Sequence, residues 1–219
     1  MSAIPNFSTT YIEAREKFCA AAAAAGASLR SKRNPTLGPD DERLYMDIAR
    51  LGPDDASNML VLTSATHGIE GYCGSGAQVS WLRNRGAASL PAGTGILLIH
   101  AVNPHGFAWT RRVNEDNVDL NRNFVDHGKP YPANPGYDEL ADAIKPAAWT
   151  EASLAKAQQT LDAFIQSNGM FGFQQAVSGG QYSHADGIFF GGNRPTWSNV
   201  TMRQTIRAEL SDRERPVEG

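Results

Sequence analysis

The chain has 219 residues, enough for one α/β domain with a substantial core. Hydrophobic residues make up 41% and charged residues 20%, as in an ordinary soluble globular protein. The formal net charge of −3 argues against a general nucleic-acid binder, and no apolar run approaches the roughly 20 residues that span a bilayer. We therefore expect neither a nucleic-acid partner nor a membrane partner.

The cysteines and the amino terminus bear on the compartment. Cys19 and Cys73 lack the spacing of a disulfide framework or of a Cys-based metal site. The first residues show no basic segment followed by an apolar stretch, which a secretory signal would have. The sequence therefore predicts a reducing, cytoplasmic location.

The first predicted element is a helix over residues 11–25. Thr10 is a suitable N-cap, and Glu13 follows it at the spacing of a capping box. The alanine-rich composition favours a helix, and Gly26 is a typical C-terminal stop.

A basic and then a turn-rich stretch follows this helix. Arg30, Lys32 and Arg33 are expected in a solvent-exposed turn. The Pro, Gly and Asp content of residues 34–41 predicts a loop.

Three strands are predicted next. Residues 44–50 alternate between apolar and polar side chains, which is typical of a half-buried strand. Residues 60–66 and 95–102 are short apolar runs, which indicate buried strands. Because a turn at residues 52–55 joins the first two strands, the first fits an antiparallel edge of a mixed sheet.

A histidine and a glutamate follow the second of these strands. His67 and Glu70 stand at its carboxyl end, where α/β sheets place their ligands. Catalytic zinc commonly binds two His and one Glu and leaves a fourth position for water. The glycine-rich residues 71–76 allow a close backbone approach, or only a tight turn into a helix predicted over residues 77–85.

Two later segments accompany this pair. Asn-Pro-His-Gly at residues 103–106 follows the third strand, and Asp-Leu-Asn-Arg-Asn occupies residues 119–123. Between them, Arg111 or Arg112 can hold an oxyanion near a metal, and the spacing does not decide which.

The three motifs, in this order, resemble the zinc carboxypeptidase clan, which also contains the succinylglutamate desuccinylases and aspartoacylases. The resemblance covers roughly residues 44–124 and continues more loosely through residues 179–182 and 191–197, as in an uncharacterised bacterial branch. His105 stands where the clan usually has Asp, and this departure supports no separate role for it.

The resemblance implies a fold and a chemistry. The expected fold is α/β, with a mixed, mostly parallel sheet flanked by helices, as in the zinc carboxypeptidase-like or phosphorylase/hydrolase-like sandwich. His67 and Glu70 would hold Zn²⁺, and Arg111 or Arg112 would act in catalysis. Asn121 and Arg122 would bind the carboxylate of a small peptide or an acyl-amino acid, because a guanidinium matches a carboxylate bidentately.

The remainder of the chain is predicted to be helical and loop-like. A Pro-rich loop over residues 128–136 leads into an irregular segment, and a helix over residues 150–167 ends at Asn168-Gly169. Residues 174–192 are expected to form a loop with a short hairpin.

A last helix is predicted over residues 196–210, with Trp197, Val200 and Ile206 on one face. Residues 1–210 are expected to form the amino-terminal part of a single zinc-hydrolase-like domain, and residues 211–219 a polar tail.

A third metal ligand and a general base are not evident. The related branch has an Asp-x-His-Thr-Gly strand and a later glutamate, and no such pattern occurs in these 219 residues. His184 is a weak substitute, and His127 lies in the Pro-rich loop. We therefore expect an amino-terminal portion of a longer enzyme, ended early.

Two functions stay open. The first is a zinc-dependent metallocarboxypeptidase-like hydrolase that cleaves an amide bond next to a free carboxylate, inactive in this truncated form. The alternative is a non-catalytic remnant or small-molecule binding module. A nucleotide-binding function is set aside, because the sequence lacks a Gly-rich phosphate loop. The truncated form should bind zinc weakly and expose an apolar edge of a three-stranded sheet.

Overall fold

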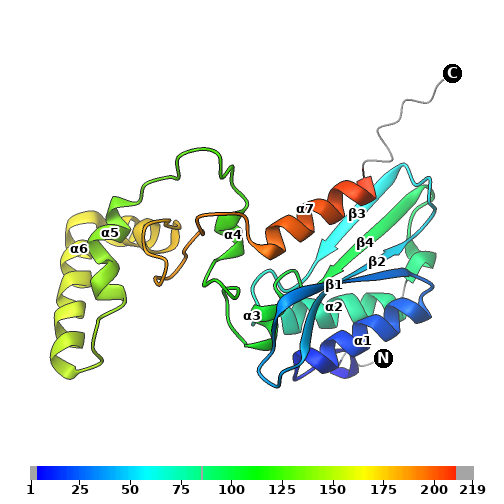
Figure 1. The fold of residues 1–219 in the computed structure, drawn as a ribbon, viewed down its shortest axis with the longest axis horizontal. Coiled ribbons are helices and arrows are strands. Elements are labelled where there is room, and N and C mark those ends of the chain that lie inside the picture. The colour runs from blue at the N-terminus through cyan, green and yellow to red at the C-terminus, as the bar shows by residue number, and fades with distance from the viewer. Residues whose placement is uncertain (1–3, 85, 211–219) are drawn as a thin grey trace. The chain divides into compact units, whose positions relative to one another are not determined.

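The computed structural model describes residues 4–84 and 86–210 (Figure 1). The chain divides into two units. The first comprises the described parts of Met1–Glu115 and Trp197–Gly219, and the second is Asp116–Thr196. The tail expected at residues 211–219 lies outside the described residues.

The first unit is built on a mixed sheet of four strands: β1 (Ser28–Leu37), β2 (Arg43–Leu51), β3 (Asn58–Thr63) and β4 (Thr94–His100). Their order is β1-β2-β4-β3. β2 pairs antiparallel with β1 and with β4, whereas β3 and β4 pair in parallel. The predicted α/β class with a mixed sheet flanked by helices is confirmed. The expectation that the sheet is mostly parallel is wrong, because only β3 and β4, which lead into the candidate site, pair in parallel.

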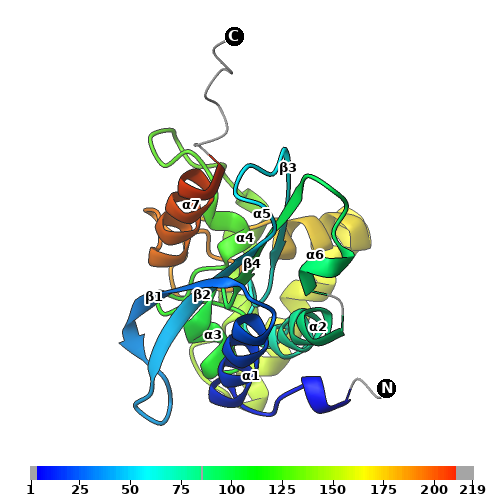
Figure 2. The same cartoon turned by 90° about the vertical axis from the view of Figure 1, so that its right-hand side faces the viewer.

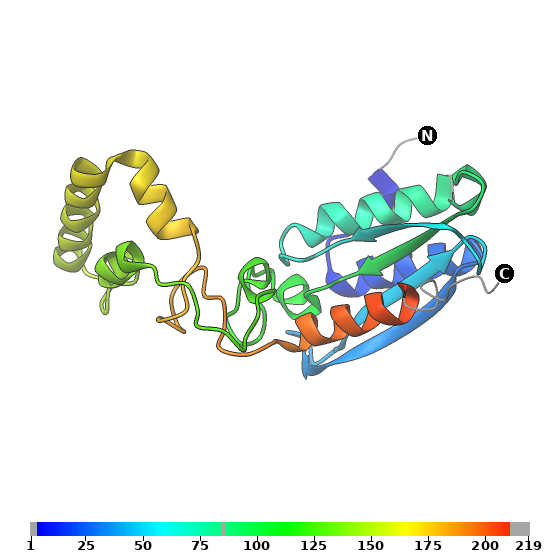
Figure 3. The same ribbon diagram turned by 90° about the horizontal axis from the view of Figure 1, so that it is seen from above.

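Helices flank both faces of this sheet. Those of the first unit are α1 (Tyr11–Ala24), α2 (Gly71–Asn84), α3 (Pro104–Ala108) and α7 (Trp197–Leu210), with the short 3-10 helices η1 (Ile4–Asn6) and η2 (Gly86–Ser89). α1 and α2 cover one face, and α7 lies over the other (Figures 2 and 3). The capping box predicted for α1 is present, because the Thr10 side chain accepts a hydrogen bond from the Glu13 amide.

β1 corrects the sequence analysis, which expected an exposed turn at Arg30, Lys32 and Arg33 and a loop over residues 34–41. Residues 30–37 instead form most of an edge strand, with an irregularity in its pairing between Arg33 and Leu37, and only residues 38–41 lie in the predicted loop. An edge strand rich in basic side chains resists pairing with other chains, and a proline is tolerated at such an irregularity. Both faces of β1 carry mostly polar side chains, so its sequence lacks the alternation of apolar and polar residues that marks a half-buried strand.

The core of the first unit lies between the sheet and α1 and α2. Phe18 and Ala21 of α1 pack with Ile96 and Leu98 of β4, and all four side chains are buried. β4 has a neighbour on each side, so it forms a continuous buried apolar run. In the described residues the sheet has four strands rather than the three expected. Its edge strand β3 is partly exposed, and Leu60 on it is 47% exposed.

α7 has the predicted bounds within one residue, but its buried side is polar. Its buried residues are Ser198, Asn199, Thr201 and Thr205, whereas Val200 is exposed. Glu209, almost fully buried, pairs with Arg30 and lies 3.8 Å from the Nε of Arg50. Ion pairing with the sheet therefore contributes to the placement of α7, in addition to apolar packing.

The second unit is helical, with α4 (Leu120–Asn123), α5 (Pro135–Ile144) and α6 (Glu151–Ser178). α5 and α6 share a small core of Leu140, Phe164 and Ala176. α5 lies where the sequence suggested only irregular structure. Asn134 caps it and Pro135 occupies its first position, so the proline read as a loop signal is a helix-start signal.

α6 is longer than predicted. Thr150 caps it, as expected from its predicted start, but the helix runs on to Ser178 beyond the predicted stop. Gly169 has φ 71° and ψ 167°, so the helical geometry does break there before a second helical segment resumes. Consequently only the later part of residues 174–192 forms the predicted loop, closed by a bridge between Gln181 and Phe190. No helix in the described part of the chain is long and apolar enough to cross a membrane.

His100 yields a prediction about pH. Its ring is buried, stacks on Phe18 with centroids 4.4 Å apart, and hydrogen-bonds through Nε2 to Ser75 Oγ at 2.9 Å. Burial lowers the pKa of His100 to about 4; the charge of Asp47 opposes this shift and that of Arg15 adds to it. As the pH falls below 6.5, His100 therefore becomes protonated in the unfolded chain while it stays neutral in the folded chain.

The contribution of His100 to stability is therefore complete above about pH 6.5 and is lost as the pH falls towards 4, by on the order of 3 kcal/mol in all. Urea unfolding of the wild type and of His100→Gln between pH 7.5 and 4.5 measures it. The wild type should lose stability more steeply over this window. Parallel slopes for the two proteins would contradict the assignment.

Candidate functional site

The candidate site begins where the parallel strands β3 and β4 end. Beyond each strand stands an alanine with a left-handed backbone: Ala65 has φ 55° and Ala101 has φ 59°. Such a conformation is uncommon for a residue with a Cβ, and it persists only where surrounding contacts hold it. The amide of Asn103 donates to the Ala65 carbonyl at 2.8 Å, so the two segments stay paired beyond the sheet.

Gln78 of α2 ties the helix to the same edge. Its Nε2 donates to the carbonyls of Leu62, at 3.1 Å, and Ile99, at 3.4 Å. Its Oε1 accepts from Ser64 Oγ at 2.9 Å. A buried amide that meets both strands fixes the position of the helix following His67 and Glu70.

The loop that carries His67 packs main chain to main chain on the segment after β4. The Gly68 amide donates to the Arg111 carbonyl at 3.0 Å, and the Arg111 amide donates to the Gly106 carbonyl at 2.8 Å. A Cβ on Gly68 would lie 1.9 Å from the carbonyl carbon and oxygen of Gly106. Glycine at position 68 is therefore required by close approach of two backbones.

Asn103 explains much of the Asn-Pro-His-Gly motif. Its side chain is buried and caps α3 by accepting a hydrogen bond from the Gly106 amide at 2.8 Å. Its Nδ2 donates to the Arg112 carbonyl at 3.4 Å. This role of Asn103 was not predicted, although Asn directly before a proline is a helix-cap signal.

His67 and Glu70 face each other. His67 Nδ1 lies 3.3 Å from Glu70 Oε2; the His67 side chain is 7% exposed and that of Glu70 65% exposed. The buried imidazole is thus held by the fold, while the carboxylate reaches solvent. Two such donors at this separation fit two ligand positions of one zinc ion.

Arg112 completes the cluster. Its Nη1 lies 3.8 Å from Glu70 Oε1, the carboxylate oxygen on the other side from His67. Arg111 serves the same loops through its main chain, by the hydrogen bonds to Gly68 and Gly106. The structure therefore brings His67, Glu70 and Arg112 together.

A full metal cluster is not present in the described residues. Across residues 4–84 and 86–210, no group of three or more His, Cys, Asp or Glu side chains is arranged to hold a metal ion. A catalytic zinc site uses three protein ligands, whereas His67 and Glu70 bring only two possible donors together.

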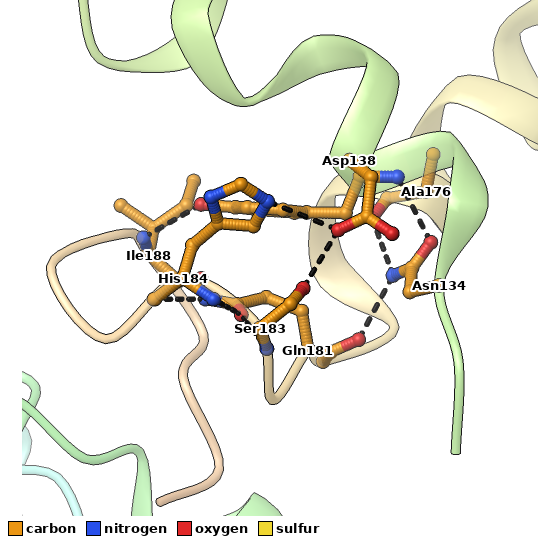
Figure 4. Close-up of polar contacts among 9 residues, drawn as sticks. Asn134, Asp138, Ala176, Gln181, Ser183, His184 and Ile188 are labelled. Atoms are coloured by element: carbon orange, nitrogen blue, oxygen red, sulfur yellow. Dashed lines mark hydrogen bonds and ion pairs between the residues drawn. The ribbon is translucent and has the colours of Figure 1, made fainter. Parts of the chain in front are cut away.

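His184, the weak candidate for a third ligand, has a partner within the second unit. Its Nε2 lies 3.0 Å from Asp138 Oδ1, and Ser183 Oγ donates to the same oxygen at 2.6 Å (Figure 4). The hydrogen bond from Ser183, and then that from His184, hold the pKa of Asp138 below its usual value. Because the serine meets the carboxylate rather than the imidazole, this is no Ser-His-Asp triad. The cluster fastens the loop to α5.

Asn121 and Arg122 also belong to the second unit. Asp119 caps α4 by accepting from the Asn121 amide, and Asn121 is exposed. Arg122 Nη2 donates to the Ser178 carbonyl at the end of α6 at 2.8 Å. Arg122 thus holds a helix end, and its role as a carboxylate ligand stays a prediction.

Two other histidines are engaged elsewhere. His105 Nδ1 lies 3.2 Å from Thr36 Oγ1, and its ring stacks on Trp109. His127 has both ring nitrogens in hydrogen bonds, to the Tyr131 hydroxyl and to the Asn123 carbonyl.

Comparison with known proteins supplies the family. A family model described as "Protein of unknown function (DUF2817)" matches residues 7–217. The chain belongs to the DUF2817 family. No curated protein matches this DUF2817 member.

Solved structures show only distant likeness. A glutaminyl cyclase from Fimbriiglobus ruber is 12% identical, and the match, with a TM-score of 0.31, covers 40% of this chain and 36% of that one. A Zn-dependent exopeptidase from Parabacteroides distasonis is 13% identical over 92% of this chain and 72% of that one, with a TM-score of 0.32. A Porphyromonas gingivalis glutaminyl cyclase is 12% identical over 94% and 81%, with a TM-score of 0.29. Because these scores are low, no residue role is carried over from them.

The close backbone contact gives a direct prediction. In Gly68→Ala the new methyl group meets the Gly106 main chain, so one loop must move away from the other. We expect a loss of about 1–3 kcal/mol in the free energy of unfolding, as in overpacked cores. Urea unfolding monitored by circular dichroism measures it.

Gly128→Ala is the matched control. A Cβ there meets only the flexible Asp126 side chain at 3.2 Å, so the change should stay within about 0.5 kcal/mol. Equal unfolding midpoints for the two variants would show that the Gly68 contact does not hold the loops together.

Proposed function

We propose that this DUF2817 member is a zinc-dependent hydrolase that cleaves an amide bond next to a free carboxylate. One observation carries the proposal: His67, Glu70 and Arg112 converge beyond the carboxyl ends of the parallel strands β3 and β4. Sites of this kind in α/β proteins lie at that edge of the sheet.

His67 Nδ1 and Glu70 Oε2 are the atoms that would hold the metal. When bound, zinc lowers the pKa of a coordinated water and polarises a substrate carbonyl. The buried His67 ring has little rotational freedom, and Glu70 lies between His67 and Arg112. The chain therefore holds both donors close to the arrangement that one ion requires.

Arg112 is the arginine best placed for the reaction. Its guanidinium stands beside Glu70, so its positive charge can stabilise negative charge that develops on a substrate oxygen next to the metal. Arg111 remains the alternative, with its main chain serving to position the loops.

The substrate proposal rests on the sequence motif. Asn121 and Arg122 would bind the free carboxylate of a small peptide or an acyl-amino acid, in which case the Arg122 guanidinium would serve two partners. Its Nη2 already meets the Ser178 carbonyl, and its Nε is buried with no hydrogen bond.

A second function is a metal- or small-molecule-binding module without turnover. The observation that favours it is the count of ligands: the described residues offer two converging metal donors rather than three. Such a pair should bind zinc, but more weakly than a complete catalytic site does.

Zinc titration tests the metal pair itself. We expect weak binding of one zinc ion by isothermal titration calorimetry, reduced at least about tenfold by His67→Ala and by Glu70→Gln, because each removes one donor. His105→Ala, which removes an imidazole outside the cluster, should bind zinc like the wild type. If it lost affinity as His67→Ala does, the assignment of ligands would be wrong.

Hydrolysis then separates the two functions. N-acetyl-leucine and a dipeptide are incubated with the protein and zinc, and release of free amino acid is measured. Release that Arg112→Gln lowers while zinc binding persists supports the hydrolase. Zinc binding without any release supports the binding module and contradicts turnover by these 219 residues.

A further inference from the structure

The second unit contains a pocket that none of the predicted site residues lines. Its volume is about 480 Å³, within the range of small-molecule sites. Two stretches of chain form its walls, one at residues 116–118 and one at residues 185–196. The lining residues are Asp116, Val118, Ala185, Phe190, Gly192, Asn193, Arg194 and Thr196.

Hydrogen bonds from the Asn117 side chain and from the Asp119 main chain join the two walls. Asn117 Nδ2 donates to the carbonyls of Ala185 and Gly187, both at 3.0 Å. The Asp119 amide donates to the Phe190 carbonyl at 2.8 Å. These hydrogen bonds hold the walls at a fixed separation along one side of the pocket.

Hydrogen bonds of the Asn123 side chain fix the turn that carries Arg194. Its Nδ2 donates to the carbonyls of Gly191 and Arg194, both at 2.9 Å, and its Oδ1 accepts from the Thr196 amide at 3.0 Å. Asn123 is fully buried. The main chain of Arg194 is therefore fixed, while its side chain is exposed.

Gln181 holds the far wall in place. It is fully buried; its Nε2 donates to the carbonyls of His184 and Ile188, and its Oε1 accepts from the amides of Ser183 and His184 (Figure 4). The Ile188 amide also donates to the Tyr137 hydroxyl of α5 at 2.9 Å. The pocket wall is thus pre-organised, which lowers the entropic cost of binding.

The pocket is lined by side chains of both charges and by apolar side chains. Arg194 and Asn193 offer a guanidinium and an amide, and the Arg194 side chain makes no hydrogen bond or ion pair with any residue in the described ranges. Asp116 places a carboxylate in the same pocket. Val118 and Phe190, both buried, provide an apolar floor.

Arg122 differs from Arg194 in this respect. One of its terminal nitrogens is committed to the Ser178 carbonyl, and a Cβ on Gly180 would lie 2.5 Å from its Cδ. A bidentate grip on a carboxylate needs an unobstructed guanidinium edge, which Arg194 has.

We propose that this pocket binds a free amino acid with an apolar side chain. Arg194 and Asn193 hold its carboxylate, Asp116 holds its ammonium group, and the side chain lies on Val118 and Phe190. The site goes beyond the proposed hydrolase and does not depend on the His67–Glu70 pair, so its test needs no metal.

The test uses three probes of one shape: leucine, N-acetyl-leucine and leucinamide, titrated calorimetrically into the full chain without zinc. Leucine should bind best, because it carries both charges. N-acetyl-leucine, which lacks the ammonium, should bind more weakly, and leucinamide, which lacks the carboxylate, weakest of all. Leucinamide binding as tightly as leucine, or no binding of any probe at millimolar concentration, would overturn the proposal.

Variants then assign the contacts. Arg194→Gln should weaken leucine at least about tenfold, since it removes charge-assisted hydrogen bonds. Lys129→Gln removes the same charge elsewhere on this unit and should leave binding unchanged. Asp116→Asn should weaken leucine but not N-acetyl-leucine. Equal affinity of the wild type and Arg194→Gln for leucine, with both folded by circular dichroism, would refute the site.

Discussion

The contact between the backbones of Gly68 and Gly106 is the constraint on which the candidate site depends. It leaves no room for a Cβ, so the loop after β3 must lie directly on the segment after β4. The hydrogen bonds of Arg111 to both glycines lock this arrangement. His67 and Arg112, which stand next to these anchors, are thereby brought to the two sides of Glu70, where His67 Nδ1 lies 3.3 Å and Arg112 Nη1 3.8 Å from its carboxylate oxygens. Main-chain contacts therefore set the position of the loops that carry the charged groups.

The sequence predicted those parts of the fold that have a strong local signal. α1 and its capping box, the three apolar strands and α7 appear close to their expected bounds. β1 was missed, since a basic edge strand shows no apolar alternation, and α5 was missed because its first residue, Pro135, was read as part of a loop. The buried polar side of α7 was equally unpredictable, because the ion pairs of Glu209 with the sheet arise only from tertiary contacts.

The candidate site shows the same division. The spacing of His67 and Glu70 after a buried strand predicted a pair, and the two side chains do face each other at 3.3 Å. Spacing could not choose between the adjacent arginines, because the choice depends on which guanidinium lies beside Glu70, and only the folded loops place that of Arg112 there. The contact of Arg122 with Ser178 was also not predicted. Ser178 lies far along the chain, at the end of the part of α6 that continues past Gly169. Close approaches and long helices with a break leave little trace in local sequence.

We propose that this fold sets His67 and Glu70 to share one metal ion. Anomalous diffraction from crystals of the protein soaked in zinc tests it most directly. We expect one anomalous peak within bonding distance, about 2.0–2.2 Å, of both His67 Nδ1 and Glu70 Oε2. A peak bound elsewhere on the chain, with no density between these two atoms at saturating zinc, would contradict it.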